Sequence, residues 1–267
     1  MAKFPPHPKR RGAVITGASS GIGLAIAEVL ALAGHPVVLG ARRLDELETA
    51  AERIRKNGGE AHAVFLDLAD SATIENFCDT ARDALGEIEI IIANAARNQV
   101  GAVLDTSPEE FESVMSINVA GTHRIIKSLL PDMIERQRGD VVFVTSDVVA
   151  NPRPSMVAYV SSKWGLEGYA RALQMELEGT GIRATVVRPG PTLTGMGMDW
   201  DADATNAALD LWRKWGLSRH DNYMRPGGVA QAVMAVVEMA RGAHITTIEI
   251  HPEAPLRPEA PNREVSK

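Results

Sequence analysis

The stretch AVITGASSGIGLAIAEVL, residues 13–30, joins an apolar run typical of a buried β-strand to a segment with helical periodicity. Three glycines separate the two parts, so the backbone can turn sharply and approach a ligand without a β-carbon in the way. The apolar residues that follow share the spacing of one helix face, and they are Ile22, Ala25, Ile26, Val29 and Leu30. The stretch therefore predicts a strand, a tight turn and a helix whose first amide groups can bind a phosphate.

Six more short apolar runs follow along the chain, each separated from the next by a longer amphipathic segment. These runs are apolar almost throughout, as expected for strands that are covered on both faces. They occupy residues 36–41, 61–66, 88–94, 140–146, 182–189 and 245–251. Ser107, Pro108 and Glu110 mark the start of one intervening helix. We predict an α/β fold: a single-domain, Rossmann-type doubly wound parallel sheet of about seven strands, flanked by helices on both faces.

We expect this domain to span residues 11–252, between a flexible N-terminal arm of residues 1–10 and a proline-rich C-terminal tail of residues 253–267. Residues 195–226 depart from the regular alternation and are rich in methionine and tryptophan. We interpret them as a substrate lid that carries Met196, Trp200 and Trp212, and we expect an apolar substrate of moderate size. Packing of these side chains on the sheet or on a neighbouring subunit is the alternative.

Composition excludes several classes of partner. The chain has 34 acidic and 28 basic residues, so no broad positive field is available to bind nucleic acid or an anionic membrane. It contains no signal-like start and no apolar run of about 18 residues. The single cysteine, Cys78, has no partner for an internal disulfide, and we expect it to be a small core residue. We predict a soluble, cytoplasmic protein with no nucleic-acid or membrane partner.

The end of the second predicted strand indicates which dinucleotide is bound. The sequence there is GARRL, residues 40–44, with Ala41 where an acidic partner of the ribose would be expected. Arg42 and Arg43 can bind a 2′-phosphate through two hydrogen bonds each, which favours NADP(H) over NAD. A solvated basic pair is the alternative. Asp67 and Asn94 end the third and fourth strands, where ligands of such sheets gather, although both could also be turn residues.

A second stretch, SDVVANPRPSMVAYVSSK (residues 146–163), predicts acid–base chemistry. Tyr159 and Lys163 are one helical turn apart and face the same groove. A phenol has an unperturbed pKa of about 10, and a neighbouring ammonium group and an oxidised nicotinamide ring would both lower that pKa. Tyr159 can then exchange a proton with a carbonyl or alcohol oxygen, while Ser146 hydrogen-bonds the same oxygen.

These motifs resemble those of the short-chain dehydrogenase/reductase family over roughly residues 11–252. TGASSGIG, residues 16–23, resembles the family's cofactor loop, and Ser146, Tyr159 and Lys163 resemble its catalytic serine and YxxxK motif. INVAG, residues 117–121, resembles the helix that carries an active-site asparagine, here Asn118. Residues 93–96 depart from the family's NNAG motif, since they read ANAA.

The resemblance implies further roles. Lys163 would also bind the nicotinamide ribose, Asn118 would hold a water that relays protons to the lysine, and Thr194 would touch the nicotinamide amide. The full cofactor set would be Gly17, Ser19, Ser20, Gly21, Ile22, Gly23, Arg42, Arg43, Asp67, Leu68, Asn94, Ala95, Tyr159, Lys163, Pro189, Gly190, Thr192 and Thr194. Family relatives form tetramers, so a homo-oligomer, tetramer or dimer, is expected.

We therefore predict an NADP(H)-dependent oxidoreductase that transfers hydride between nicotinamide and a carbonyl or secondary alcohol. The alternative is a dinucleotide-sensing binding protein of the same fold without turnover. Four aspartates, Asp199, Asp201, Asp203 and Asp210, are spaced as in a calcium loop. Ala204 stands where that loop needs glycine, so we expect no metal and interpret Asp201 or Asp203 as a helix cap.

Overall fold

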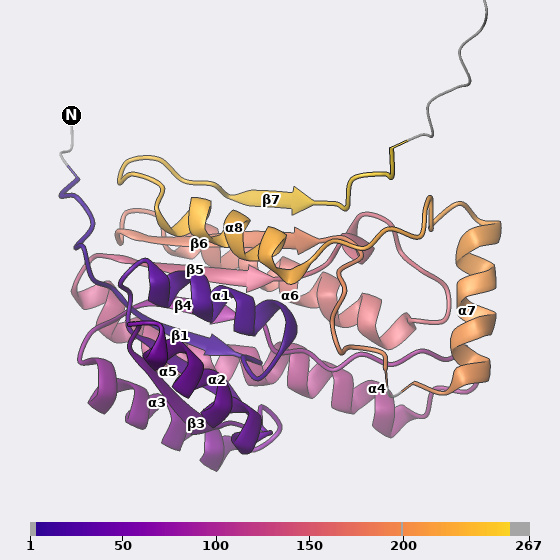
Figure 1. The fold of residues 1–267 in the computed structure, drawn as a ribbon, viewed down its shortest axis with the longest axis horizontal. Coiled ribbons are helices and arrows are strands. Elements are labelled where there is room, and N and C mark those ends of the chain that lie inside the picture. Colours follow the sequence, from indigo (N-terminus) through magenta and orange to yellow (C-terminus); the bar gives the residue numbers. More distant parts are fainter. Residues whose placement is uncertain (1–3, 199, 257–267) are drawn as a thin grey trace, which may run out of the picture.

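The seven strands in the described part of the chain form one parallel sheet (Figure 1). The computed structural model describes residues 4–198 and 200–256, so predictions for residues 1–3, Asp199 and residues 257–267 lie outside it. Strand order is β3-β2-β1-β4-β5-β6-β7, which confirms the doubly wound Rossmann-type prediction. The strands are β1 (Gly12–Thr16), β2 (Val37–Ala41), β3 (Ala61–Phe65), β4 (Ile88–Ala93), β5 (Gly139–Val144), β6 (Ile182–Pro189) and β7 (Thr247–Ile250).

Helices cover both faces of the sheet. The buried side chains of α1, α2 and α8 form one hydrophobic cluster with the sheet, and those of α3, α5 and α6 form a second. The helices are α1 (Gly21–Leu32), α2 (Leu44–Lys56), α3 (Ser71–Leu85), α4 (Pro108–Met115), α5 (Thr122–Glu135), α6 (Val157–Glu176), α7 (Ala202–Lys214) and α8 (Pro226–Val237). A π-helical turn, η1 (Ser116–Gly121), joins α4 to α5, and a 3-10 turn, η2 (Asp147–Val149), follows β5.

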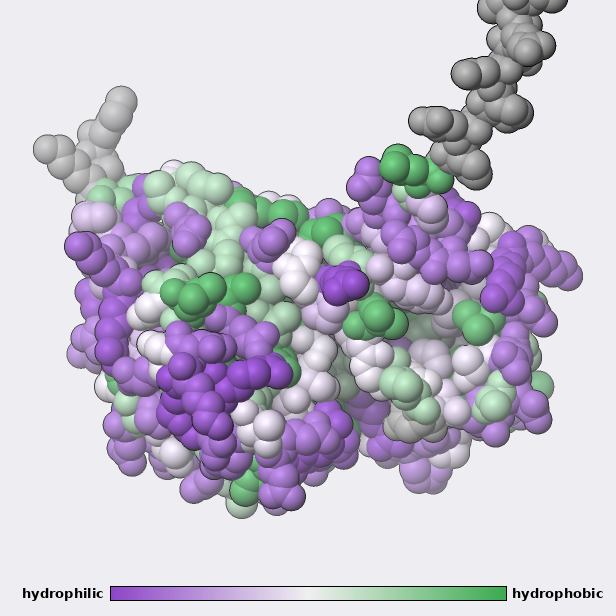
Figure 2. All heavy atoms as spheres, in the orientation of Figure 1, coloured by the Kyte–Doolittle hydropathy of each residue, from purple (hydrophilic) through white to green (hydrophobic). Residues whose placement is uncertain are grey.

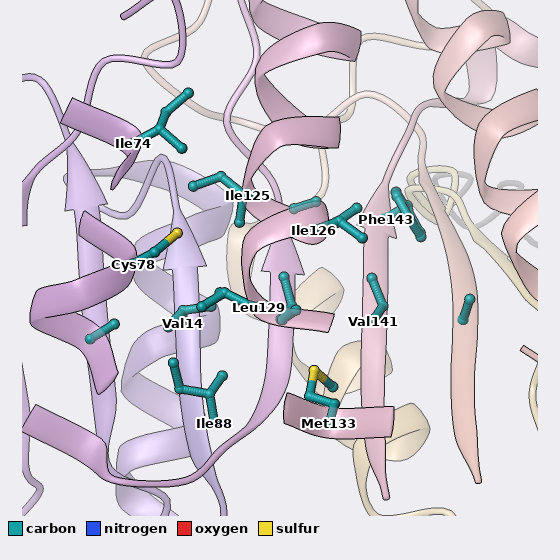
Figure 3. Close-up of a cluster of buried hydrophobic side chains, with 14 of the residues drawn as sticks. Val14, Ile74, Cys78, Ile88, Ile125, Ile126, Leu129, Met133, Val141 and Phe143 are labelled. Carbon is teal, nitrogen blue, oxygen red and sulfur yellow. The ribbon is translucent and has the colours of Figure 1, made fainter. Parts of the chain in front are cut away.

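The core explains why the predicted strands are apolar on both faces. In β5, Val141 and Phe143 belong to the cluster with α3, α5 and α6, whereas Val142 and Val144 belong to the other cluster. Figure 3 shows the first cluster, with Cys78 of α3 among its side chains. The Cys78 thiol is fully buried and burial raises its pKa, so the prediction of a small core residue is confirmed.

The described part of the N-terminal arm, residues 4–10, contacts the domain through side chains. Arg10 forms an ion pair with Glu60 at 2.8 Å. The imidazole Nε2 of His7 lies 3.2 Å from the carbonyl oxygen of Met239, and burial lowers the pKa of His7 to about 4. His7 is therefore neutral at pH 7, and residues 4–10 are held on the domain.

The carboxyl ends of the strands lie on the side of the sheet that faces α7 (Figure 1). Figure 2 shows hydrophobic residues in separate groups among hydrophilic ones on the face seen in Figure 1. Within the described residues, no helix is both long enough and apolar enough to span a bilayer. The fold thus leaves the carboxyl edge of the sheet as the place where loops from several strands converge.

Candidate active site

The glycine turn between β1 and α1 has the backbone geometry that its sequence predicts. Gly17 and Gly21 have positive φ angles of 69° and 59°, which residues with a β-carbon rarely adopt. A β-carbon on Gly23 would lie 2.4 Å from the carbonyl oxygen of Gly17, so this helix residue must be glycine for the turn to pack. The backbone of the turn can therefore come close to a bound group.

A cavity of about 700 Å³ lies at the carboxyl ends of the strands and brings together most of the predicted residues. Gly23 and Asn118 are not among the residues that line it, and neither are Trp200 and Trp212. The predicted residues that do line it are Gly17, Ser19, Ser20, Gly21, Ile22, Arg42, Arg43, Asp67, Leu68, Asn94, Ala95, Ser146, Tyr159, Lys163, Pro189, Gly190, Thr192, Thr194 and Met196. One cavity thus joins the glycine turn to the Ser-Tyr-Lys group.

Arg43 lies directly over the glycine turn. Its Nη2 donates hydrogen bonds to the hydroxyl oxygens of Ser19 at 3.0 Å and Ser20 at 2.8 Å. Its Nη1 donates to Glu46 at 2.9 Å. Hydroxyls, amides and a guanidinium around a glycine cradle are the groups that bind phosphates, so these residues fit a dinucleotide.

Two polar residues after β3 and β4 shape the same cavity. The Asn94 side-chain amide donates to the carbonyl oxygens of Thr16 at 2.9 Å and Gly17 at 3.3 Å, which ties the end of β4 to the glycine turn. The Asp67 carboxylate accepts a hydrogen bond from the amide of Ala69 at 2.9 Å. Both therefore hold turns and also face the cavity.

Ser146, Tyr159 and Lys163 meet at the inner end of the cavity. Ser146 comes two residues after β5, and the other two lie on α6. All three are buried, with exposed fractions of 7%, 7% and 2%. The Lys163 ammonium nitrogen donates to the carbonyl oxygen of Val144 at 2.9 Å and lies 5.6 Å from the centre of the Tyr159 ring. The predicted common groove is thus present.

The pKa values of this group differ from the sequence-based expectation. Burial raises the pKa of Tyr159 to about 12; the Ser146 hydroxyl and Arg153 lower it, and Asp147 raises it. Burial also lowers the pKa of Lys163 to about 7, because a charged ammonium loses its hydration there. The protein's own groups therefore leave the phenol pKa high, since burial outweighs the neighbouring charges, and the lowering by an oxidised nicotinamide ring stays a prediction.

Asn118 is fully buried in η1 and connects three segments. Its side-chain Nδ2 donates to the Ser162 hydroxyl at 2.8 Å and to the carbonyl oxygen of Arg97 at 2.9 Å. Its Oδ1 accepts from the amide of Arg97 at 2.7 Å. The side chain thus joins η1 to α6 and to the segment after β4, and its water-holding role stays a prediction.

The two ends of the segment predicted as a lid lie side by side. The amide of Leu193 donates to the carbonyl oxygen of Met224 at 2.8 Å, and the amide of Met224 donates to Pro191 at 2.9 Å. Met196 lines the cavity, whereas Trp200 and Trp212 pack on the cluster that contains Tyr159. Both tryptophans therefore contact the catalytic region from outside the cavity.

Helix α7 lies within this segment and starts at the aspartate that the sequence suggested as a cap. The Asp201 carboxylate accepts a hydrogen bond from the amide of Ala204 at 2.9 Å, which confirms the helix-cap interpretation. Among the described residues, no three carboxylate, histidine or cysteine side chains lie together as a metal site.

Sequence reasoning missed two charged residues beside Ser146. Asp147, which is buried, and Arg153, which is partly buried, form an ion pair with 2.6 Å between Arg153 Nη2 and Asp147 Oδ2. They also line a second cavity of about 320 Å³. Only their presence within residues 146–163 pointed to them in the sequence, because no short-range spacing rule pairs residues six positions apart in a loop.

Comparison with known proteins identifies the family of the chain. A family model for short chain dehydrogenases matches residues 11–205, so the chain belongs to the short-chain dehydrogenase/reductase family. It is 32% identical over 240 residues to 2,3-dihydro-2,3-dihydroxybenzoate dehydrogenase of Bacillus subtilis, covering 88% of this chain and 91% of that one. It is 33% identical over 241 residues to glycine betaine reductase of Emericella nidulans, covering 90% of this chain but only 18% of that protein.

A solved structure of an alcohol dehydrogenase has the same fold. The alcohol dehydrogenase of the archaeon Thermococcus sibiricus, in complex with 5-hydroxy-NADP, superposes with a TM-score of 0.79 at 28% identity. The match covers 94% of this chain and 100% of that one. The chain is accordingly an oxidoreductase of this family, which acts on small-molecule carbonyl or alcohol substrates with a nicotinamide dinucleotide.

Proposed function

We propose that this protein is an NADP(H)-dependent dehydrogenase/reductase of secondary alcohols and carbonyls, with Tyr159 as the general acid/base. One observation carries the proposal: Ser146, Tyr159 and Lys163 line the same cavity as the glycine turn. A proton donor and a dinucleotide cradle in one cavity are what a carbonyl reduction requires. A dinucleotide sensor would need only the cradle.

The protein's own groups suit the reductive direction at neutral pH. Because burial raises its pKa to about 12, Tyr159 is protonated at pH 7 and can donate to a developing alkoxide oxygen. Ser146 can hydrogen-bond the same oxygen and stabilise its charge. When bound, the nicotinamide supplies the hydride or accepts it, and its oxidised ring adds a positive charge near the phenol. Lys163 holds its position through Val144 and supplies a further, partly protonated, cationic group.

Arg42 and Arg43 support NADP(H) as the cofactor. Both line the cavity, and Arg43 donates hydrogen bonds to the Ser19 and Ser20 hydroxyls of the glycine turn. A 2′-phosphate beside the second strand would accept hydrogen bonds from both guanidinium groups. Ala41, at the end of β2, offers no carboxylate to a ribose hydroxyl.

Substitution of Tyr159 by phenylalanine tests this function directly. NADPH consumption with a panel of ketones should fall by at least about 100-fold in Tyr159→Phe, in line with the loss of a general acid. NADPH binding, followed by fluorescence, should persist. Tyr169→Phe is the matched control, because Tyr169 lies on the same helix, contacts His123 at 3.2 Å and does not line the cavity. Thermal shifts with NADPH but no turnover of any carbonyl would favour the sensor instead.

The proposal also includes the substrate class, the assembly and the compartment of the protein. An apolar substrate is supported by Met196 and Met198 on the cavity wall. We propose a tetramer or dimer in the cytoplasm, on the basis of family resemblance and the single buried cysteine. Light scattering of the purified chain checks the assembly, and a monomeric mass would contradict it.

A further inference from the structure

An ion pair between a buried carboxylate and a partly buried guanidinium lies directly beside Ser146. Asp147 is only 4% exposed, and the Ser146 hydroxyl donates a hydrogen bond to its Oδ1 at 3.2 Å. Arg153 binds both oxygens of the same carboxylate, through Nη1 to Oδ1 at 3.1 Å and through Nη2 to Oδ2 at 2.6 Å. Asp147 thus contacts the Ser146 hydroxyl and Arg153 at once.

The same arginine also contacts the lid. Its guanidinium carbon lies 5.6 Å from the centre of the Trp212 ring, a distance at which a cation and an aromatic face attract each other. The Trp212 indole nitrogen donates to the carbonyl oxygen of Pro154 at 2.9 Å. Helix α7 is therefore joined to the segment after β5 by two different interactions.

We propose that Asp147 and Arg153 form a positioning pair. Asp147 holds the Ser146 hydroxyl, whose single proton turns to the substrate oxygen when substrate binds. Arg153 balances the charge of Asp147 and connects this carboxylate to Trp212 on the lid helix. This inference rests on the proposed function, since it assigns a role toward Ser146 and Tyr159. Neither residue of the pair is itself a proton donor to the substrate.

Stability alone does not account for such a pair. The buried Asp147 carboxylate and the partly buried Arg153 guanidinium both lose hydration, and apolar side chains of similar volume often stabilise a protein equally well. A charge near a titrating phenol, in contrast, changes the proton affinity of that phenol, which apolar side chains do not do. The position of the pair is therefore better explained by the active site than by folding.

Asp147 and Arg153 are the charged groups that change the pKa of Tyr159, and Lys163 lies against its ring. Lys163 faces its ring from the same helix, Asp147 comes from η2, and Arg153 comes from the loop after η2. Asp147 raises the phenol pKa and Arg153 lowers it, both on top of the larger effect of burial.

Removal of the negative charge of Asp147 and removal of the positive charge of Arg153 should therefore shift the kinetic pKa in opposite directions. We expect the apparent pKa of kcat to fall in Asp147→Asn and to rise in Arg153→Met, measured from pH 6 to 11 on the full chain with NADP⁺ and one secondary alcohol, because the oxidised ring would lower the phenol pKa toward this range. The loss of a hydrogen bond to a charged group should also lower kcat about 10- to 100-fold in each. Arg153→Lys keeps the charge and should keep the wild-type pKa.

Two further variants separate positioning from folding. The double variant Asp147→Asn/Arg153→Met leaves no unpaired buried charge and remains available if a single variant does not fold. Asp140→Asn is the matched control, because Asp140 is a buried carboxylate paired with Arg183 at the opposite end of β5. It should lower the melting temperature without moving the kinetic pKa. An active double variant with wild-type kcat and pKa would overturn the proposal.

The inference and the proposed function can fail separately. If Tyr159→Phe abolishes turnover while Asp147→Asn and Arg153→Met keep the wild-type pH profile, the pair is structural and only this inference fails. If the wild type turns over no carbonyl, the proposed function fails. The indole N–H signal of Trp212 in an NMR spectrum, assigned with Trp212→Phe, then tests the connection to the lid. It should shift in both single variants, and an unchanged signal would overturn the connection.

Discussion

Replacement of Arg43 by alanine should change the choice of dinucleotide more than the fold. The side chain is 57% exposed and donates to the Ser19 and Ser20 hydroxyls at the glycine turn, where a 2′-phosphate would lie within its reach. A hydrogen bond to a charged group contributes about 1.5–3 kcal/mol, which corresponds to about 10- to 150-fold in Kd. Because solvent screens an exposed side chain, we expect the lower value, about tenfold, for NADPH.

Isothermal titration of wild type and Arg43→Ala with NADPH and with NADH is the assay. The Kd for NADPH should rise about tenfold while that for NADH changes by no more than about twofold, and 1 M salt should reduce the difference. Arg53→Ala is the control, because Arg53 lies on α2, the helix that begins directly after Arg43, is 53% exposed and forms an ion pair with Glu28 away from the cavity. Equal weakening of both dinucleotides, or of neither, would refute the assignment of Arg43 to the phosphate.

Three other predictions concern the turn, the lysine and the lid. Gly23→Ala should destabilise the protein by about 1–3 kcal/mol and weaken NADPH binding, because its β-carbon would meet a backbone oxygen at 2.4 Å. Gly168→Ala, in an exposed helix position with open space, should instead stabilise it by about 0.5–1 kcal/mol, and urea unfolding compares the two. Lys163 has a folded pKa of about 7, below its value in the unfolded chain, so the unfolded state binds more protons between pH 7 and 10. Wild-type stability should therefore rise with pH across that window relative to Lys163→Met, by about 1 kcal/mol for each pH unit, and parallel pH curves would contradict the low pKa. Met196→Ala, which removes an apolar side chain from the cavity wall, should raise the KM for bulky apolar ketones more than for small ones, and unchanged KM values across a ketone series would argue against the lid.

Local patterns were sufficient for the fold and for most of the cavity. Uniformly apolar strand segments require cover on both faces, and the residues of β5 alternate between two helix layers as that requirement implies. The need for glycine at positions 17 and 21 could be predicted because a positive φ angle is a property of single residues. Tyr159 and Lys163 could be paired because a helix sets the distance between residues four positions apart.

Contacts between distant segments and the effects of burial were decided only by the tertiary structure. The sequence suggested that a neighbouring lysine and an oxidised nicotinamide ring together lower the phenol pKa. Among the protein's own groups, burial of Tyr159 and Lys163 dominates and moves both pKa values toward the neutral forms. The partners of Asn118 and the link from Arg153 to Trp212 join residues tens of positions apart. By itself the sequence determined the elements and the type of chemistry, because both depend on residue type and short-range spacing. Dehydration and long-range contact exist only once the chain is packed, and for that reason they had to come from the folded structure.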